Sequence, residues 1–437
     1  MRRSALAMVL IFAVSLIAGC GSTSTTGTTP TNTPPTAGRG AVVYVSETSQ
    51  TFGSTPGVGT MGGLIEGFAL DTTSGVLTPL AGSPFATSSS TTNDMALAPN
   101  GGNLYVLGQQ FPSGTCCVGP SSLLVFALDP NTGAPSFKQS LATNASEGSK
   151  LAVAPSGKFV YVAPYSGGDI NGIGIFAVQS DGTLVASGSL ASTQSTGDVV
   201  ISPNGAFLYT SSDGGPVGNL GNNPCGPFNS FIWGFSVDAA TGALAPLPGS
   251  PFTFQRQLCV VGHVPNYVTK QIDPRGQRLF VIDSFNGDIT SFAINPSTGA
   301  LTLLPGTTTE GAVASFTSSA MDPLSGFLYV GSTIDFFTGF SLTGNAASGV
   351  LPLLAGMPAQ VAPLPNFDQG STALAVDSSG NFLFSNENEF TSAFSCCGPD
   401  DFVEFRIDSA TGALAQLRSA PTKLAATASR IAPAPPR

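Results

Sequence analysis

A turn of the form D-x-x-T-G-x-L recurs seven times along this chain, and no other feature constrains the fold as strongly. Clear copies are DTTSGVL from Asp71, DAATGAL from Asp238 and DSATGAL from Asp408. The turn glycines lie 49 to 63 residues apart, at Gly75, Gly133, Gly182, Gly242, Gly299, Gly349 and Gly412. Such a near-regular, elastic period is typical of propellers and solenoids, in which a fixed structural unit carries loops of variable length.

Each repeat has the pattern of four short strands. An alternating segment precedes the turn, as in WGFSV through Phe235, and the segment LAPLPGSPF ending at Phe252 follows it. A third segment ends at Pro-x-Gly, as in MALAPNG from Met95. The remaining one carries an aromatic residue at a constant place, namely Tyr44, Tyr105, Tyr161, Tyr209, Phe280, Tyr329 and Phe384. Period-two alternation bounded by Gly, Pro, Asn and Asp predicts antiparallel strands. We therefore predict an all-β fold, a seven-bladed β-propeller with four antiparallel strands per blade.

The two ends of the chain are complementary. The first repeat lacks its innermost strand, because the repeat pattern begins at AVVYVSE from Ala41. The C-terminal SRIAPAP has the pattern of the missing strand, with Ile431 aligned to Leu97 and Pro433 to Pro99. An unpaired strand edge is open to unwanted association. We predict that this C-terminal strand pairs with the strand of Tyr44 and closes the ring.

The N-terminus has the pattern of an exported lipoprotein. Arg2 and Arg3 precede an apolar stretch over residues 5–18, which is short for a membrane span and typical of a signal peptide. The segment LIAGC ending at Cys20 resembles the bacterial lipobox, which implies cleavage after Gly19 and a lipid on Cys20. The alternative is an ordinary signal peptide with a chance cysteine. We expect an exported protein held by its lipid in the bacterial cell envelope, at the outer membrane or the cell surface.

The expected domains follow from this division. Residues 1–19 are the predicted signal peptide, residues 20–40 a tether and residues 41–437 a single propeller domain. The tether is rich in Ser, Thr, Pro and Gly and has too few apolar residues to bury a core. Charged residues make up only 9% of the chain and the net charge is -10, which argues against nucleic acid as a partner.

Six cysteines besides Cys20 suit an oxidising compartment. Two of them, Cys225 and Cys259, fall in neighbouring connections of the fourth blade, so we predict a disulfide between them. The other four form two adjacent pairs, which are predicted vicinal disulfides: Cys116 with Cys117, and Cys396 with Cys397. Metal binding by these pairs is the alternative. No histidine neighbours them, and we expect neither a metal site nor a cofactor.

The repeated A-V-x-P-x-G-x-x-L-Y-V, followed by V-x-x-F-x-x-D-x-x-T-G-x-L-x-P-L-x-G-S-P-F, resembles the lactonase family of seven-bladed propellers. This family includes 6-phosphogluconolactonases and muconate-cyclising homologues. The resemblance covers nearly all of residues 41–437 and implies lactone hydrolysis as an activity. It also implies a site at the mouth of the central channel, where enzymes of the family use polar and charged side chains. No short motif here marks those side chains.

Strand ends and loops of the top face supply the candidate site residues. A lactone hydrolase needs a base to activate water and a cation for the carbonyl oxyanion. His263, the one histidine, lies with Arg256 in the longest insert, residues 253–266, and together with Asp213 forms the candidate catalytic set. The candidate ligand-binding residues lie at the ends of second strands or the starts of first strands, and are Glu47, Asp94, Lys150, Asp198, Asp283 and Glu387.

Two functions remain open at this point. The main prediction is a monomeric cell-envelope module that binds a glycan, a protein or a small molecule through its top-face loops. It is favoured because no catalytic residue repeats at the strand ends and the chain is poor in charge. The alternative is a lactonase-like hydrolase with its site at the mouth of the channel.

Overall fold

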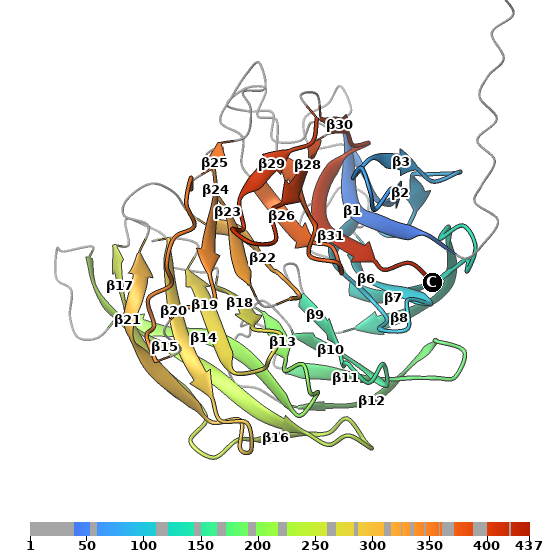
Figure 1. Cartoon of the computed structure of the whole chain (residues 1–437). Helices are drawn as coiled ribbons and strands as arrows, with labels where there is room; N and C mark the ends of the chain where they lie inside the picture. The colour runs from blue at the N-terminus through green and yellow to red at the C-terminus, as the bar shows by residue number, and fades with distance from the viewer. Residues whose placement is uncertain are drawn as a thin grey trace, which may run out of the picture. The chain divides into compact units, whose positions relative to one another are not determined.

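Seven antiparallel sheets follow one another along the chain in the computed structural model, one for each sequence repeat (Figure 1). The described residues are all in strands, turns or irregular segments, and none forms a helix long and apolar enough to cross a membrane. The structure describes residues 39–52, 59–110, 121–143, 150–163, 172–190, 198–216, 225–259, 268–283, 287–309, 316–324, 326–332, 336–344, 347–357, 359–360, 371–387, 400–418 and 421–437. The predicted all-β propeller of seven four-stranded blades is confirmed.

The blades are numbered from the N-terminus, and the strands of each run from the innermost to the outermost. Blade 1 contains β31 (Thr427–Ala434), β1 (Ala41–Phe52), β2 (Gly59–Leu70) and β3 (Leu77–Pro79), with β4 (Phe85–Ala86) also beside β2. Blade 2 contains β5 (Thr91–Leu97), β6 (Asn103–Gln109), β7 (Ser121–Leu128) and β8 (Pro135–Thr143). Blade 3 contains β9 (Lys150–Val153), β10 (Phe159–Ala163), β11 (Ile173–Val178) and β12 (Leu184–Leu190). Blade 4 contains β13 (Val199–Ile201), β14 (Phe207–Pro216), β15 (Cys225–Val237) and β16 (Leu244–Pro246), with β17 (Phe252–Cys259) also beside β15.

The last three blades follow the same order. Blade 5 contains β18 (Val268–Ile272), β19 (Arg278–Asp283), β20 (Asp288–Ile294) and β21 (Leu301–Thr309). Blade 6 contains β22 (Phe316–Met321), β23 (Phe327–Ser332), β24 (Phe336–Ser341) and β25 (Ala359–Gln360). Blade 7 contains β26 (Ser371–Val376), β27 (Phe382–Glu387), β28 (Asp401–Ile407) and β29 (Leu414–Gln416), with β30 (Thr422–Lys423) also beside β28.

The C-terminal strand closes the ring as the sequence predicts. β31 pairs with β1 in an antiparallel register that sets Ile431 opposite Val45 and Pro433 opposite Val43. The equivalent pairs of blade 2 are Met95 with Val106 and Leu97 with Leu104, so the predicted alignment of Ile431 to Leu97 is wrong by two residues although the pairing itself is confirmed. Each inner strand contacts the inner strand of the next blade, and β31 contacts both β26 and β5. Arg39, just before β1, is already buried, and its guanidinium donates to the carbonyl of Gly101 at 3.0 Å. Blade 1 is therefore built from the two ends of the folded chain.

The fourth strand differs from its prediction in blades 1, 4 and 7, where two short segments pair with the third strand in its place. The outer chain leaves β2 after Pro79 and rejoins it at Phe85, so the expected single strand is two short ones. Within the gap, Ser83 Oγ accepts a hydrogen bond from Gly67 N at 3.0 Å and replaces a backbone acceptor. In blade 4 the rejoined strand is β17, so part of the insert predicted over 253–266 is a strand. Its alternation explains this, since Phe254 is buried between exposed neighbours.

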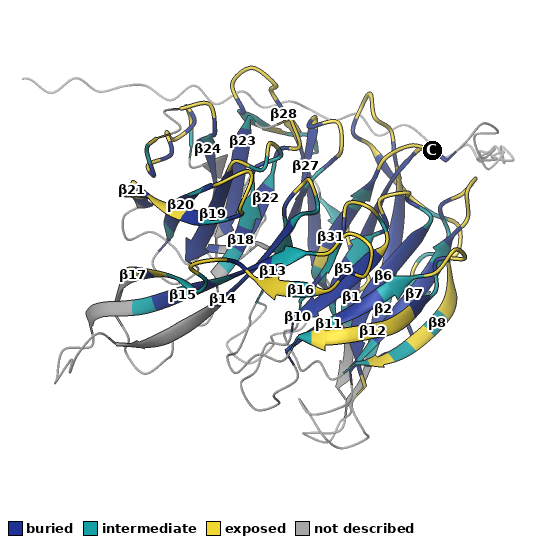
Figure 2. Ribbon diagram, turned by 90° about the horizontal axis from the view of Figure 1, so that it is seen from below, coloured by how far each residue is buried: buried dark blue, intermediate teal, exposed yellow. Residues whose placement is uncertain are grey.

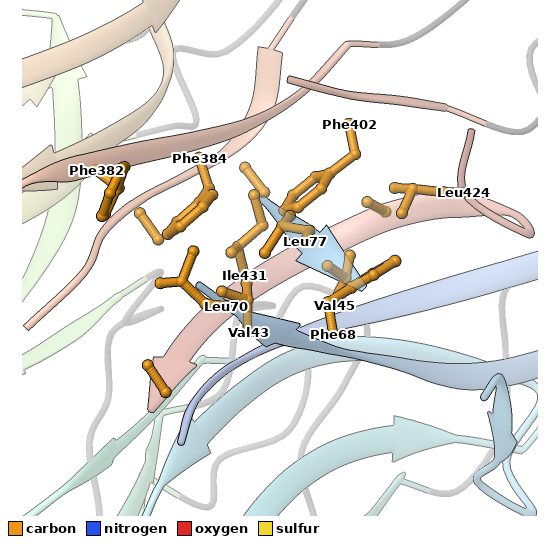
Figure 3. Packing of buried hydrophobic residues seen from close by; sticks show 14 residues of the cluster. Val43, Val45, Phe68, Leu70, Leu77, Phe382, Phe384, Phe402, Leu424 and Ile431 are labelled. Atoms are coloured by element: carbon orange, nitrogen blue, oxygen red, sulfur yellow. The ribbon is translucent and has the colours of Figure 1, made fainter. Parts of the chain in front are cut away.

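Seven apolar clusters form the core, and each lies between two neighbouring blades. Figure 3 shows the cluster that joins blade 1 to blade 7, where Phe402 stacks on Phe68 at 5.7 Å and on Phe384 at 6.0 Å between ring centroids. The outer strands β8 and β12 are exposed along most of their length, whereas the inner parts of the blades are buried (Figure 2). Apolar burial therefore holds blade to blade around the ring.

The repeated aromatic position also joins neighbouring blades. Four tyrosines donate to the carbonyl of the turn glycine in the next blade: Tyr44 to Gly133 at 2.6 Å, Tyr161 to Gly242 at 3.0 Å, Tyr209 to Gly299 at 2.7 Å and Tyr329 to Gly412 at 2.9 Å. Where blade 5 has Phe280, the hydroxyl of Ser291 donates to Gly349 instead, at 2.9 Å. Tyr105 is different, since its hydroxyl is buried without a hydrogen-bond partner in the described part of the chain. The turn it would reach is shorter, with Gly182 N bonded to Gln179 O three positions back.

Tyr209→Phe is expected to destabilise the fold by about 1–3 kcal/mol, because the buried Gly299 carbonyl loses its donor. Tyr105→Phe is the matched control and is expected to change stability little, because its hydroxyl makes no such bond in the described structure. Thermal or denaturant unfolding of both variants measures the difference. Equal losses in the two variants would contradict the role given to the tyrosine hydroxyl.

Candidate functional site

Two of the predicted ligand-binding carboxylates bind the next blade. Asp94 lies on inner strand β5, and its Oδ2 accepts a hydrogen bond from Leu151 N in blade 3 at 2.8 Å. Asp198 precedes inner strand β13, and its Oδ2 accepts from Lys270 N in blade 5 at 2.9 Å. The repeat geometry explains the similarity, since both carboxylates stand at the same place in their blade. These groups therefore join inner strands to one another.

A buried lysine completes the contact between blades 4 and 5. The side chain of Lys270 is fully buried, and its Nζ donates to Ser211 Oγ at 2.8 Å. The same ammonium lies 3.7 Å from Oδ2 of Asp198. A charge removed from water needs such partners, since an isolated one is costly to bury. Lys270 therefore links blade 5 to blade 4 at this end of their inner strands.

Arg430 is a cation on the inner strand that closes the ring. Its Nε lies 3.3 Å from Oδ1 of Asp94, and 46% of its side chain is exposed to solvent. Because Asp94 is also bound by Leu151 N, the carboxylate that holds Arg430 is itself fixed. The arrangement presents a guanidinium that is oriented by a buried partner and still open to solvent.

A group of carboxyls lies on the other side of β31, where blade 7 meets blade 1. Asp400, just before β28, accepts hydrogen bonds on Oδ2 from Ala428 N at 2.8 Å and from Asn386 Nδ2 at 2.7 Å. Asn386 in turn accepts from Ala373 N at 2.6 Å. Burial raises the pKa of Asp400 to about 7, although these hydrogen bonds act in the opposite direction. A carboxyl with a pKa near 7 can exchange a proton at neutral pH.

Glu47 belongs to the same group. It is fully buried on β1, opposite Ala428 of β31. Burial, followed by the nearby charge of Glu66 on β2, raises the pKa of Glu47 to about 9. Glu66 is also buried, with a raised pKa, and accepts a hydrogen bond from Ala425 N at 2.9 Å. Glu47, Glu66 and Asp400 thus form one group of buried carboxyls where blade 7 meets blade 1.

The remaining ligand-binding candidates lie at three other places. Glu387, next to Asn386, is buried, and its Oε1 accepts from Ser385 Oγ at 3.0 Å. Asp283 is buried at the end of β19, in register with Asp288 of β20. Lys150 is half-buried at the start of inner strand β9. Of the six candidates, Glu47 lies in the blade 7 to blade 1 contact, and Glu387 adjoins one of its residues.

The predicted catalytic set is described only in part. His263 lies outside the described residues. Asp213 is on β14 in register with Ser230, and Arg256 is on β17 in register with Phe228. Because β15 lies between these two strands, their backbones are about 9–10 Å apart. The backbone therefore places Arg256 on the outer strand of blade 4, separated from inner strand β13 by β15 and β14.

Of the cysteines, one predicted pair has a described backbone. Cys225 and Cys259 are register partners on β15 and β17. Directly opposed residues of an antiparallel pair have Cα atoms about 4.5–5.5 Å apart, within the range of disulfides. The bond itself stays a prediction.

The other cysteine predictions fall on residues that the structure does not describe. The predicted lipid attachment at Cys20 is one of them. The two predicted vicinal disulfides are the others, and their cysteines are Cys116 and Cys117 in blade 2 and Cys396 and Cys397 in blade 7. All three therefore stay predictions.

Sequence reasoning missed Arg430, although the repeat holds a signal for it. In the structure Arg430 faces Ser46 and is equivalent to Asp94 and Lys150, two of the predicted ligand-binding residues, so a correctly placed alignment of the last strand includes it among them. Asp400 has no such signal, because it follows a connection that differs between blades. Among the described residues, no three His, Cys, Asp or Glu side chains are arranged to hold a metal ion. A pocket of about 250 Å³ lies between β17 and β21, lined by Phe254 and Leu303 among others, away from the inner strands.

Comparisons with known proteins agree with this architecture. A 6-phosphogluconolactonase from Formosa agariphila is 32% identical over 112 residues, which are 25% of this chain and 24% of that protein. The match thus spans about a quarter of that relative. A proposed 6-phosphogluconolactonase from Bacteroides uniformis superposes with a TM-score of 0.63 at 15% identity, covering 91% of this chain and all of the other. The periplasmic gluconolactonase of Pseudomonas aeruginosa gives 0.53 at 17% identity, covering 90% and 98%.

Structural likeness at these identities shows the fold alone. The family assignment rests instead on the sequence profile described as "Lactonase, 7-bladed beta-propeller", which matches residues 43–197 and 185–316. Those residues include most of blades 1 to 5 and make up more than half of the chain. This protein therefore belongs to the lactonase family of seven-bladed β-propellers.

Proposed function

We propose that this protein hydrolyses a lactone at the end of the propeller where the inner strands begin. The observation that carries the proposal is membership of the lactonase family over more than half of the chain. It supports the hydrolase, which the sequence offered as the alternative, better than the binding module. The solvent-open Arg430, held by Asp94, supports this end of the inner strands as the site.

The reaction asks for two kinds of group. Water attacks the lactone carbonyl while a base accepts its proton, and the negative charge that forms on the carbonyl oxygen needs a donor or cation. The ring C–O bond then breaks, and the leaving oxygen takes up a proton to give the hydroxy acid. In our proposal the guanidinium of Arg430 faces the carbonyl oxygen. Its Nε lies 3.3 Å from Asp94 Oδ1 as an ion pair, and the guanidinium has five N–H donors in all with which to meet the substrate.

Two groups are proposed as the base. Asp400 has a pKa of about 7, and it binds the amide of Ala428, two positions from Arg430 on the same strand. His263 is the one imidazole in the chain and has the unperturbed pKa best suited to the role. Comparison of Asp400→Asn with His263→Ala distinguishes them, since loss of the base costs about 10²–10⁴-fold in rate.

Lactone turnover by the purified full chain tests the proposal. Glucono-δ-lactone and its 6-phosphate hydrolyse slowly by themselves, so acid release is followed with and without protein. We expect a rate above the spontaneous one that increases in proportion to protein concentration. No acceleration of either lactone, together with binding of a glycan or small molecule, would favour the binding module instead.

We also propose the cell envelope as the place of action, anchored through a lipid on Cys20. The lipobox-like LIAGC and the tether after it support this. The mass of the N-terminal peptide from membrane-extracted protein is expected to correspond to an acylated Cys20. An unmodified terminus at another residue would contradict it.

A further inference from the structure

The contact that closes the ring contains a buried carboxyl without a hydrogen bond. Glu47 is fully buried, and neither of its carboxyl oxygens has a hydrogen-bond partner in the described part of the protein. It lies opposite Ala428 at the start of β31, the strand that joins the C-terminus to blade 1. Val45, two residues before Glu47 on β1, lies on the same side of that strand. Together with Ile431 of β31 it belongs to the apolar cluster of Figure 3, which joins blade 7 to blade 1. Any charge on Glu47 therefore forms inside the buried contact between blade 7 and blade 1.

The charged groups around Glu47 are mainly acidic. Glu66 faces it from β2, and Asp400 faces it from the residue before β28. Two cations on neighbouring strands are paired with other carboxylates. Lys423 of β30 lies 2.9 Å from Asp401, and Arg430 of β31 lies 3.3 Å from Asp94 of β5. Ionised Glu47 would thus meet like charges without a cation of its own among the described residues.

The neighbouring backbone offers little compensation. Ala425 N donates to Oε1 of Glu66 at 2.9 Å. The amides of Ala425 and Ala426 oppose the rise in the pKa of Glu47 but are outweighed by burial. From β5, the hydroxyl of Thr92 donates to the backbone carbonyl of Glu47 at 3.0 Å, which does not reach the carboxyl.

We propose that closure of the ring depends on a proton held by Glu47, so that loss of this proton weakens the attachment of β31 to blade 1. With the proton in place, the carboxyl is neutral and β31 packs over it. Once the carboxyl is ionised, either it must be hydrated or the strand must separate from it, because an unpaired buried charge is costly. This dependence of ring closure on a proton does not rely on the proposed hydrolysis.

The direction of the pH effect follows from the raised pKa. An unfolded glutamate loses its proton near pH 4.5, whereas Glu47 in the folded protein holds it to about pH 9. Between these values opening releases a proton, so rising pH favours opening. Asp400 acts in the same direction, but its contribution is complete near pH 7. The exposed turn aspartates act only below their ordinary pKa of 3.8, and the buried tyrosines only above 10. Glu66 also has a pKa raised by burial and acts in the same direction, so the range from pH 7 to 9 is assigned to Glu47 by comparing variants of the two residues.

Hydrogen exchange of the full chain from pH 7 to 9 tests the proposal. After correction for the intrinsic rate of each amide, the opening constant of residues 428–434 is expected to rise about tenfold per pH unit, because one proton is released. Glu47→Gln is expected to remove this slope, whatever its effect on overall stability. Glu387→Gln is the matched control, since it changes the equivalent position of blade 7, and the slope is expected to persist.

A second variant keeps the test decisive if Glu47→Gln does not fold. Glu66→Gln removes a like charge and is expected to lower the pH at which the rise ends. A flat or falling opening constant in the unmodified protein, or a slope retained in Glu47→Gln, would overturn the proposal. Addition of Ca²⁺ at pH 9 is a further measurement. If Ca²⁺ strongly stabilises the protein and Glu47→Gln abolishes this effect, then a cation, and not a proton, neutralises Glu47 in this contact.

Discussion

Deletion of residues 428–437 is expected to abolish the cooperative unfolding transition of the propeller. The deletion removes most of β31, so β1 loses its inner neighbour and the backbone hydrogen bonds between them, each worth about 0.5–1.5 kcal/mol. It also exposes the contact surface of the buried Ile431, whose own burial is worth about 1.5–3 kcal/mol. Asp400 also loses its hydrogen bond from Ala428 N, and Asp94 loses its contact with Arg430. Together these losses approach the 5–15 kcal/mol by which a typical fold is stable.

The matched control for this deletion is removal of Pro436 and Arg437, which follow the end of β31 at Ala434. It loses the hydrogen bond from Arg437 N to Arg39 O and the side-chain contacts of Arg437, so only a modest fall in melting temperature is expected. Calorimetry and near-ultraviolet circular dichroism measure both truncations. A longer truncation that melts at the temperature of the intact protein would mean that β31 does not stabilise the ring.

Arg430→Gln is expected to lower lactone turnover by about 10²–10³-fold in kcat, the usual cost of losing one group that stabilises an oxyanion. Folding is expected to persist, because the side chain is 46% exposed. If the cation contacts the transition state, the loss falls on kcat rather than on KM alone. Steady-state kinetics on the lactone that is turned over fastest measures the effect.

Two further variants limit the interpretation of that result. Lys138→Gln removes a cation from the outer strand β8, where its side chain is 30% exposed, and is expected to leave turnover unchanged. Asp94→Asn removes the charge that holds Arg430 and is expected to give a smaller loss than Arg430→Gln. Turnover that survives Arg430→Gln at full rate would exclude this guanidinium from the site and direct attention to His263 and Arg256.

The repeat explains why so much of the architecture could be predicted. Strand type, the number of blades and the pairing of β31 with β1 all follow from residues that recur at fixed places, such as Tyr44 and its equivalents. Alternation is a local property, and a strand in one repeat has the same neighbours as its equivalents in the others. The broken fourth strand was missed because Ser83 takes over a backbone role that no pattern of apolar residues reveals.

The candidate site was predicted less well for a physical reason. Asp94 and Glu47 were assigned as ligand-binding residues because they stand near strand ends, a placement that the sequence reveals by itself. Whether such a carboxyl meets an amide, a cation or another carboxyl depends on the blade packed against it. Asp94 meets Arg430, which lies at the far end of the chain, and Glu47 meets Glu66 and Asp400.

The sequence by itself thus determined the blades, their order and the strand that closes them, because hydrophobic periodicity and turn residues act over a few neighbouring positions. Only the tertiary structure decided which polar groups share a contact, since blades are joined through side chains of different repeats. It also decided their protonation, because the pKa of Glu47 depends on burial beneath β31 and the residues before it rather than on its neighbours in the chain.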